Sequence, residues 1–304
     1  METNAPQGSD VSVVIVSYHT KDELRTCLSC IEPEHQIIVV DNASTDGSPE
    51  MVEQDFPNVQ LIRLDQNVGF GAANNIGARK AERRFTLFLN SDAYAKSGAI
   101  QKLAEAMDRL EANAVGGRLL NVDGSLQQSV AGPLTLTAVF LEQSGLEKLL
   151  KRYWRTPTAS GDHRVWQVMG ACFCIRTGSI EFDERFFLYC EDTDLFKRLH
   201  DTGRDKIFYI ADAEFTHVLG ASSVQNRWLS VARYNAGKEL FFKIHFGSSA
   251  YTMCLILDRM GAFARLLAWS MIGLFRFDFS NARLWWKVFT APLGEQFRPG
   301  RSER

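Results

Sequence analysis

The chain has 304 residues, of which 45% are hydrophobic and 23% charged, and its formal net charge is -2. This ordinary globular balance predicts one large or two moderate domains and excludes a strongly basic, nucleic-acid-binding type of protein. The total conceals an asymmetry, because residues 1–226 carry 22 Lys and Arg against 31 Asp and Glu, whereas residues 227–304 carry 12 against 5. A basic tail on an acidic body favours contact between the tail and an anionic surface.

Four short apolar runs, rich in β-branched residues or Phe, lie in the first ninety residues. They are Val11–Tyr18, Ile37–Val40, Val59–Leu64 and Phe85–Leu89. Such continuous runs are typical of strands buried on both faces of a parallel sheet. Helical patterns alternate with them, and residues 20–23 (Thr-Lys-Asp-Glu) form a capping box at the start of the first helix. The alternation predicts an α/β fold with a doubly wound sheet, in which ligands bind beyond the carboxyl ends of the strands.

The pattern changes after residue 113. Leu119–Ser129 is typical of a hairpin, Val165–Ile175 of a strand and Asp192–His200 of a short helix. The expected organisation is a flexible start at 1–9, an α/β half at 10–113, a mixed half at 114–249, and an amphipathic helical segment at 250–304. The first ten residues are polar and lack the apolar core of a signal peptide, so a cytoplasmic location is expected.

The C-terminal segment is rich in Leu, Met, Phe and Trp, yet charged residues recur throughout Tyr251–Phe289. The longest uncharged apolar run, Leu266–Phe275, is shorter than the roughly 20 residues that span a bilayer. Helices in the membrane interface fit better, with Trp269, Trp285 and Trp286 at headgroup depth. The alternative is a helical hairpin that packs on the body or forms a homodimer.

Polar side chains follow the predicted strands. Asp41 can accept hydrogen bonds from a nucleobase or ribose, although residues 41–47 also suit a turn and helix cap. Residues 67–75 open a helix with small residues that let the backbone approach a diphosphate. Their G-x-G lacks the third Gly or Ala of a dinucleotide fingerprint, which argues against a dehydrogenase. Asp92, in the turn at residues 90–92, can bind Mg²⁺ or Mn²⁺ together with substrate phosphates, although an Asp at a turn is usually a cap.

Three acids, Glu191, Asp192 and Asp194, begin the later helix. They repel one another unless a ligand or a shifted pKa relieves them, and a carboxylate at a cleft can serve as a general base. The structural alternative is that first-turn acids complement the helix dipole. His217 follows the apolar and acidic stretch Ile210–Phe215, and a lone His is more often structural than a ligand.

In this order, these pieces resemble glycosyltransferase family 2, a large family of inverting enzymes with the GT-A fold. The matching stretches are Val11–Tyr18 for the opening strand, Val39–Ser48 for the second motif, Asn67–Gly77 for the third, Leu89–Asp92 for the metal-binding D-x-D, and Glu191–Asp192 for the pair that ends in the catalytic base. The resemblance covers about residues 10–245, and the joint occurrence is more specific than any single motif. The Asn-x-Asp form, the Asn-Asn-Ile-Gly run and the ending His217, Gly220 and Ser222 are most similar to bacterial rhamnosyltransferase-type members.

The resemblance implies that residues 10–113 form the nucleotide-sugar-binding half, and residues 114–249 the acceptor-binding and catalytic half, of one GT-A domain. It also implies a role for each matching position. The residues implied to bind the nucleotide-sugar, the first two at the nucleoside, are Ser17, Asp41, Asn67, Gly69, Asn74, Asn90 and Asp92. Asp92 and His217 would hold Mg²⁺ or Mn²⁺ on the diphosphate. Asp192 would take the proton from the acceptor hydroxyl, while Glu191 and Asp194 would shape its field or bind the acceptor.

Two departures from the family pattern affect the metal. Asn90 replaces the first Asp of the D-x-D, which weakens metal binding in the absence of the nucleotide-sugar. Asn74 stands where many members have Arg, so the diphosphate charge must be met chiefly by the metal.

The expected function is transfer of a sugar, with rhamnose from a dTDP carrier as the candidate, to a glycan or lipid-linked acceptor at the inner face of the cell membrane. A nucleotidyltransferase would need a Gly-rich basic loop after the first strand, where residues 18–22 read Tyr-His-Thr-Lys-Asp. A non-catalytic nucleotide-binding scaffold protein of a polysaccharide-assembly system is the remaining alternative.

Overall fold

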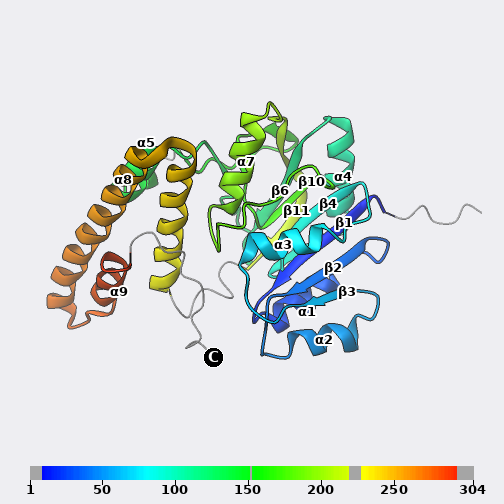
Figure 1. Ribbon diagram of the computed structural model, residues 1–304, viewed down its shortest axis with the longest axis horizontal. Helices are drawn as coiled ribbons and strands as arrows, with labels where there is room; N and C mark the ends of the chain where they lie inside the picture. Colours follow the sequence, from blue (N-terminus) through cyan, green and yellow to red (C-terminus); the bar gives the residue numbers. More distant parts are fainter. Residues whose placement is uncertain (1–8, 151–152, 219–226, 293–304) are drawn as a thin grey trace, which may run out of the picture.

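The computed structural model describes residues 9–150, 153–218 and 227–292 (Figure 1). Its main sheet runs in the order β3-β2-β1-β4-β10-β6-β11-β5, with β8 paired to β11, and a two-stranded sheet joins β7 to β9. The strands are β1 (Val11–Ser17), β2 (Gln36–Asp41), β3 (Gln60–Arg63), β4 (Phe85–Asn90), β5 (Ala93–Ala95), β6 (Ala114–Leu120), β7 (Val130–Ala131), β8 (Asp162–Arg164), β9 (Gln167–Val168), β10 (Cys172–Arg176) and β11 (Ile207–His217).

The four predicted strands of the first half are confirmed as β1 to β4, and they are mutually parallel. The register pairs Ser17 with Asp41 and Val16 with Asn90. The carboxyl ends of β1, β2 and β4 therefore meet at one edge of the sheet. This edge collects the polar residues that follow each strand.

The second half completes a mixed sheet. β10 lies antiparallel between β4 and β6, while β11 runs parallel to β6 and antiparallel to β5. The single strand expected at Val165–Ile175 is wrong, because a turn in which Cys172 N–H donates to the Met169 carbonyl splits it into β9 and β10. The hairpin expected at Leu119–Ser129 is reduced to one bridge, Leu120 with Leu126, beside a tight turn.

Helices cover both faces of the sheet. The helices of the described ranges are α1 (Lys21–Ser29), α2 (Ser48–Asp55), α3 (Phe70–Ala78), α4 (Ala99–Arg109), α5 (Leu136–Ser144), α6 (Glu147–Leu150), α7 (Glu191–Asp201), α8 (Arg227–Arg276) and α9 (Ser280–Phe289). One core packs α1, α2 and α4 on one face, and a second packs α3 and α7 on the other. Figure 1 shows α3 and α7 together in front of the sheet. The short helix expected at Asp192–His200 is thus confirmed as α7.

The C-terminal helices stand beside the sheet (Figure 1). α8 is interrupted at Gly247, whose φ of 82° and ψ of -175° lie outside the helical region, so residues 227–246 and 248–276 form two helical halves. The second half begins next to residue 250, the expected start of the amphipathic C-terminal segment, and the first half precedes it. A third apolar cluster, which includes Phe241, Phe242 and Cys254, joins α8 to α5 and to the loop before α7.

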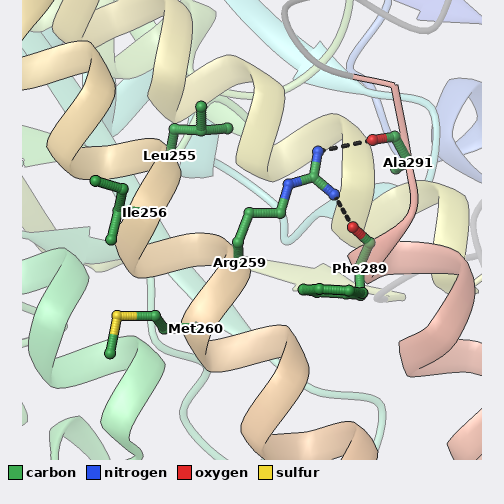
Figure 2. Close-up of a pocket in the computed structure, with 6 residues that line it drawn as sticks. All are labelled: Leu255, Ile256, Arg259, Met260, Phe289 and Ala291. Atoms are coloured by element: carbon green, nitrogen blue, oxygen red, sulfur yellow. Dashed lines mark hydrogen bonds between the residues drawn. The ribbon is translucent and has the colours of Figure 1, made fainter.

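Buried charges fix the halves of α8 against each other. The ammonium of Lys238 in the first half is fully buried and lies 2.8 Å from Asp258 Oδ1 in the second half and 3.1 Å from Glu142 Oε2 in α5. Arg259 extends from α8 to the carboxyl end of α9, where its guanidinium donates to the carbonyl oxygens of Phe289 and Ala291 (Figure 2). A cation at a helix carboxyl end satisfies carbonyls that the helix cannot.

Candidate active site

The end of β2 supplies a carboxylate with a free acceptor. Asp41 is 2% exposed, and its Oδ2 accepts from the Ser44 N–H at 2.9 Å. Its Oδ1 is buried and accepts no hydrogen bond within the described ranges. Burial raises the pKa of Asp41 above its ordinary value, partly offset by the Ser44 hydrogen bond. A buried acceptor without a partner at a strand end suits a nucleobase N–H or a ribose hydroxyl.

Hydroxyl groups connect the neighbouring strand ends. Ser17 Oγ lies 3.1 Å from Thr20 Oγ1, which donates to Ser91 Oγ at 2.9 Å. The expected capping box is therefore wrong, because the Thr20 hydroxyl bonds across to the turn after β4 and not to the helix backbone. The Thr20 hydroxyl thus links the end of β1 at Ser17 to the turn after β4 at Ser91.

The loop that leads into α3 is held by side-chain amides. Asn42 donates from Nδ2 to Asn67 Oδ1 at 3.0 Å and accepts at Oδ1 from the Val68 N–H at 2.9 Å. Gly69 has a φ of 96°, and a Cβ there would lie 2.5 Å from the Phe187 carbonyl oxygen, so only glycine fits. Asn74 is 1% exposed and donates to the Phe70 carbonyl one turn back, so its amide is used inside α3. The structure thus brings Asn67 and Gly69 to the site edge and places Asn74 within the helix.

The turn after β4 brings Asp92 against His217. Asp92 Oδ1 lies 3.2 Å from His217 Nε2, and both side chains are largely buried. Strand pairing holds the two together, because β5 and β11 place Ala93 opposite His217, and the Val218 N–H donates to the Asp92 carbonyl. Gly220 and Ser222, which the resemblance groups with His217, lie outside the described residues.

Gln127, which the sequence did not single out, fixes the tautomer of His217. Gln127 Nε2 donates to Asn121 Oδ1 at 2.9 Å, which leaves Oε1 as the atom 2.7 Å from His217 Nδ1. A carbonyl oxygen only accepts, so Nδ1 carries the proton and the neutral ring presents the Nε2 lone pair to Asp92. Two lone pairs facing each other at 3.2 Å repel unless a proton or cation is shared between them.

These residues fit a divalent cation. Asn90 Oδ1 is buried without a partner within the described ranges, and Asn90 Nδ2 lies 3.5 Å from His217 Nε2. A carboxylate and an imidazole nitrogen, here those of Asp92 and His217, are ligands that Mn²⁺ or Mg²⁺ accepts when phosphates complete the shell. No group of three or more His, Cys, Asp or Glu side chains that could hold a metal by itself occurs in the described ranges. A divalent cation held by Asp92 and His217 would therefore need further ligands from a substrate.

Asp192 lies in the first turn of α7 and is bound to the backbone of the sheet. Its Oδ2 accepts from the Gly170 N–H at 2.9 Å and its Oδ1 from the Thr193 N–H at 2.7 Å. The next residue after Gly170, Ala171, accepts at its carbonyl from the Asn90 N–H at 2.9 Å. Burial raises the pKa of Asp192, and the backbone hydrogen bonds partly oppose the shift. This carboxylate is therefore a stronger base than an ordinary Asp.

The two flanking acids differ in their surroundings. Glu191 is 6% exposed, its Oε2 has no partner in the described part of the chain, and burial followed by repulsion from Asp192 raises its pKa to about 8. Asp194 is fully buried, and each of its oxygens has a cationic or donor partner, Arg198 Nε at 2.7 Å and His245 Nε2 at 2.8 Å. Glu191 thus carries a proton at neutral pH, while Asp194 links α7 to α8 and offers no free oxygen to an acceptor.

A mixed, doubly wound sheet with these polar strand ends is the GT-A fold of sugar-transferring enzymes. The S. aureus TarS structure (residues 1–349) has the same fold, with a TM-score of 0.51 and 19% identity, over 94% of this chain and 76% of that chain. The chain belongs to glycosyl transferase family 2, whose model matches residues 12–175. It is therefore a glycosyltransferase, and family membership excludes the nucleotidyltransferase alternative.

Two curated relatives match parts of the chain. The N-acetylglucosaminyl-diphospho-decaprenol L-rhamnosyltransferase of Mycobacterium tuberculosis is 29% identical over 235 residues, which is 67% of this chain and 75% of the relative. The succinoglycan biosynthesis protein ExoO of Rhizobium meliloti is 30% identical over 151 residues, which is 45% of this chain and 43% of that protein.

Proposed function

We propose that this glycosyltransferase moves one sugar, with inversion, from a nucleoside diphosphate-sugar to a glycan or lipid-linked acceptor in the synthesis of a cell-surface polysaccharide. We propose rhamnose, carried on dTDP, as the sugar. The Mycobacterium tuberculosis relative supports rhamnose as the sugar and a lipid-linked acceptor, since its name specifies L-rhamnosyl transfer and a diphospho-decaprenol acceptor. The name of the Rhizobium relative supports a polysaccharide product.

One observation carries the proposal. Asp192 is bound to Gly170, and the adjacent Ala171 is bound to Asn90 at the end of β4. Asp192, the candidate base, is therefore joined through Gly170 and Ala171 to the turn that holds Asp92. A site for the diphosphate and a site for proton removal are both needed for sugar transfer, and this connection supports their adjacency.

The residues account for the proposed chemistry. An acceptor hydroxyl attacks the anomeric carbon as Asp192 takes its proton, so that a new C–O bond forms while the bond to the diphosphate oxygen breaks. Attack from the face opposite the leaving group inverts that carbon. Bound at Asp92 and His217, Mg²⁺ or Mn²⁺ would neutralise the charge that develops on the diphosphate. The free Asp41 Oδ1 would orient the nucleoside.

The test is a screen of nucleotide-sugars with the full chain and Mn²⁺ or Mg²⁺. We expect dTDP-rhamnose to give the fastest release of nucleoside diphosphate, and a diphospho-polyprenol-linked acceptor to increase it. If nucleoside diphosphate were released only from another nucleotide-sugar, that sugar would take the place of rhamnose in the proposal. Binding of nucleotide-sugars without release from any of them would favour the scaffold alternative.

Replacing Glu191 with Gln tests the proton on that carboxyl. Because the pKa of Glu191 is raised to about 8, Gln matches the neutral form present at pH 7, and the variant should keep the wild-type KM for the nucleotide-sugar. Above that pKa the wild-type side chain, whose Cβ packs near Gly71 at the start of α3, gains a negative charge. The wild-type KM for an anionic substrate should then rise while that of the variant stays level. Equal rises in both proteins would contradict this assignment.

We also propose that α8 and α9 lie in the interface of an anionic membrane, at the cytoplasmic face of the cell membrane. Large apolar side chains are exposed on the second half of α8, on α9 and on the turn between them, including Met253, Met260, Phe263, Leu267, Met271, Leu274, Phe275, Phe277 and Trp286. An exposed apolar patch of this kind is typical of a contact surface, and basic residues on the same helices favour anionic lipid. α8 is long and apolar enough to cross a membrane by length and composition. However, the Lys238–Asp258 pair favours an interfacial position, because a crossing would take both charges into lipid.

Glutamates at Met271 and Phe275 test the membrane surface. These side chains are 64% and 85% exposed, so the substitutions should leave folding unchanged. Each should weaken binding to phosphatidylglycerol vesicles by about 10-fold or more, because burial of such a side chain contributes about 1.5–3 kcal/mol. Vesicle co-sedimentation provides the measurement, with Val122→Glu on a distant exposed turn as the control. The proposal would be contradicted if the wild-type protein did not bind the vesicles. If the protein were a dimer and the substitutions dissociated it, the homodimer alternative would be supported instead.

A further inference from the structure

The turn directly before the candidate base has an unfavourable backbone. Tyr189 and Cys190 have φ values of 74° and 65°, in the left-handed region that side chains with a Cβ rarely adopt. Neither residue is a glycine, Asn or Asp, the types that tolerate this region best. Such a conformation persists only when surrounding structure holds it. Since Glu191 and Asp192 follow immediately, whatever holds this turn also sets the position of the base.

The first half of α8 covers the turn. A Cβ at Gly237 would lie 2.7 Å from the Tyr189 carbonyl oxygen and 3.3 Å from the Cys190 side chain, so the helix backbone rests directly on the turn. The Tyr189 ring meets the Tyr234 ring edge-on, with centroids 6.2 Å apart. Cys190 is buried in the cluster that includes Phe241. An L side chain at position 237 would push these two elements apart.

A second contact joins α8 to the first turn of α7. His245 Nε2 lies 2.8 Å from Asp194 Oδ1, with the His side chain 9% exposed and the Asp side chain fully buried. The other carboxylate oxygen binds Arg198 Nε, and Arg198 also donates to the Glu181 carbonyl. Asp194 lies two residues beyond Asp192, so its contacts with Arg198 and His245 hold the first turn of α7 from its own helix and from α8.

We propose that the first half of α8 is a positioning element of the active site, in which Gly237 supports the Tyr189–Cys190 turn and His245 fixes the first turn of α7 through Asp194. Neither residue touches substrate; both act by holding Asp192. This inference rests on the proposed function, because it takes Asp192 as the base. It also gives Asp194 a positioning role in place of acceptor binding.

Full-length His245→Ala and His245→Gln proteins test the contact. The Ala variant should lose about 10-fold or more in kcat, since misplacement by about 1 Å costs on the order of 10²-fold, while KM for the nucleotide-sugar stays at its wild-type value. The Gln variant should recover part of kcat, because its amide can donate to Asp194. His163→Ala is the control, because it removes a half-buried ring on β8 that contacts the Ala159 carbonyl oxygen and the Tyr209 ring, and it should leave kcat unchanged.

Gly237→Ala tests the turn independently, with Gly261→Ala as its match. Gly261 is also on α8 and is more closely crowded, with its nearest atom at 2.2 Å, but by the Gln143 and Arg265 side chains. Only the first variant should lower kcat at unchanged KM. The inference would be overturned if Gly237→Ala and His245→Ala both kept the wild-type kcat, or if Gly261→Ala lost as much kcat as Gly237→Ala. In either case Asp192→Asn would still be inactive, so the proposed function would stand. Nucleotide-sugar turnover unaffected by Asp192→Asn would instead overturn the proposed function.

Discussion

Asp192→Asn should lower kcat by about 10²- to 10⁴-fold, the usual contribution of a general base, while nucleoside diphosphate binding is unchanged. Only the carboxylate form accepts a proton, and burial raises the pKa of Asp192. Wild-type kcat should therefore rise with pH through a value above that of an ordinary Asp. The residual activity of the Asn variant should lack this rise, which a pH series of initial rates would reveal.

The backbone around Asp192 defines the control for this substitution. Both carboxylate oxygens accept from backbone N–H groups, at Gly170 and Thr193, whereas an amide has only one oxygen. The unpaired donor costs about 1–3 kcal/mol, so the melting temperature must be measured beside the rate. Asp201→Asn at the exposed end of α7, where the carboxylate pairs with Lys197, should leave kcat unchanged. Near-normal turnover in Asp192→Asn would exclude it as the base.

The first half of the fold could be predicted from the sequence because buried parallel strands carry a local signal. Continuous apolar runs located β1 to β4 to within two residues at each end. β11 lacks that signal, since its register shifts between Ile210 and Glu214 and polar residues interrupt the run. The insertion of β10 between β4 and β6 is a tertiary event that no local pattern encodes. Sequence periodicity therefore gave the nucleotide-binding half more accurately than the half that follows it.

The site divides in the same way. Asp41 and Asp92 follow strands directly, so their place at the sheet edge could be predicted. The pairing of Asp92 with His217 came only from the resemblance, because 125 positions separate them in the chain. Gln127 and His245 carried no signal, since a Gln after a polar turn and a His within an amphipathic helix are both common. Each becomes meaningful only through the atom that it contacts.

Gln127→Leu should lower the affinity for Mn²⁺ by about 10- to 100-fold, the range typical for partners that orient a metal-binding His. Without Oε1, Nδ1 of His217 loses its acceptor, and the proton can move to the nitrogen that faces Asp92. The Glu variant keeps an acceptor for Nδ1 and should retain the affinity. The free Mn²⁺ signal in electron paramagnetic resonance, recorded with nucleoside diphosphate present, measures binding without relying on turnover.

Gln128→Leu is the matched control, because this neighbour is exposed and its Oε1 accepts from the Thr156 N–H, away from His217. It should bind Mn²⁺ as the wild type does. If both Leu variants lost affinity equally, local unfolding would explain the loss. Wild-type affinity in Gln127→Leu would show that His217 needs no orienting partner. A selective loss at Gln127, with metal-free nucleotide binding intact, would show that one carboxylate suffices because the imidazole beside it is held in its metal-binding tautomer.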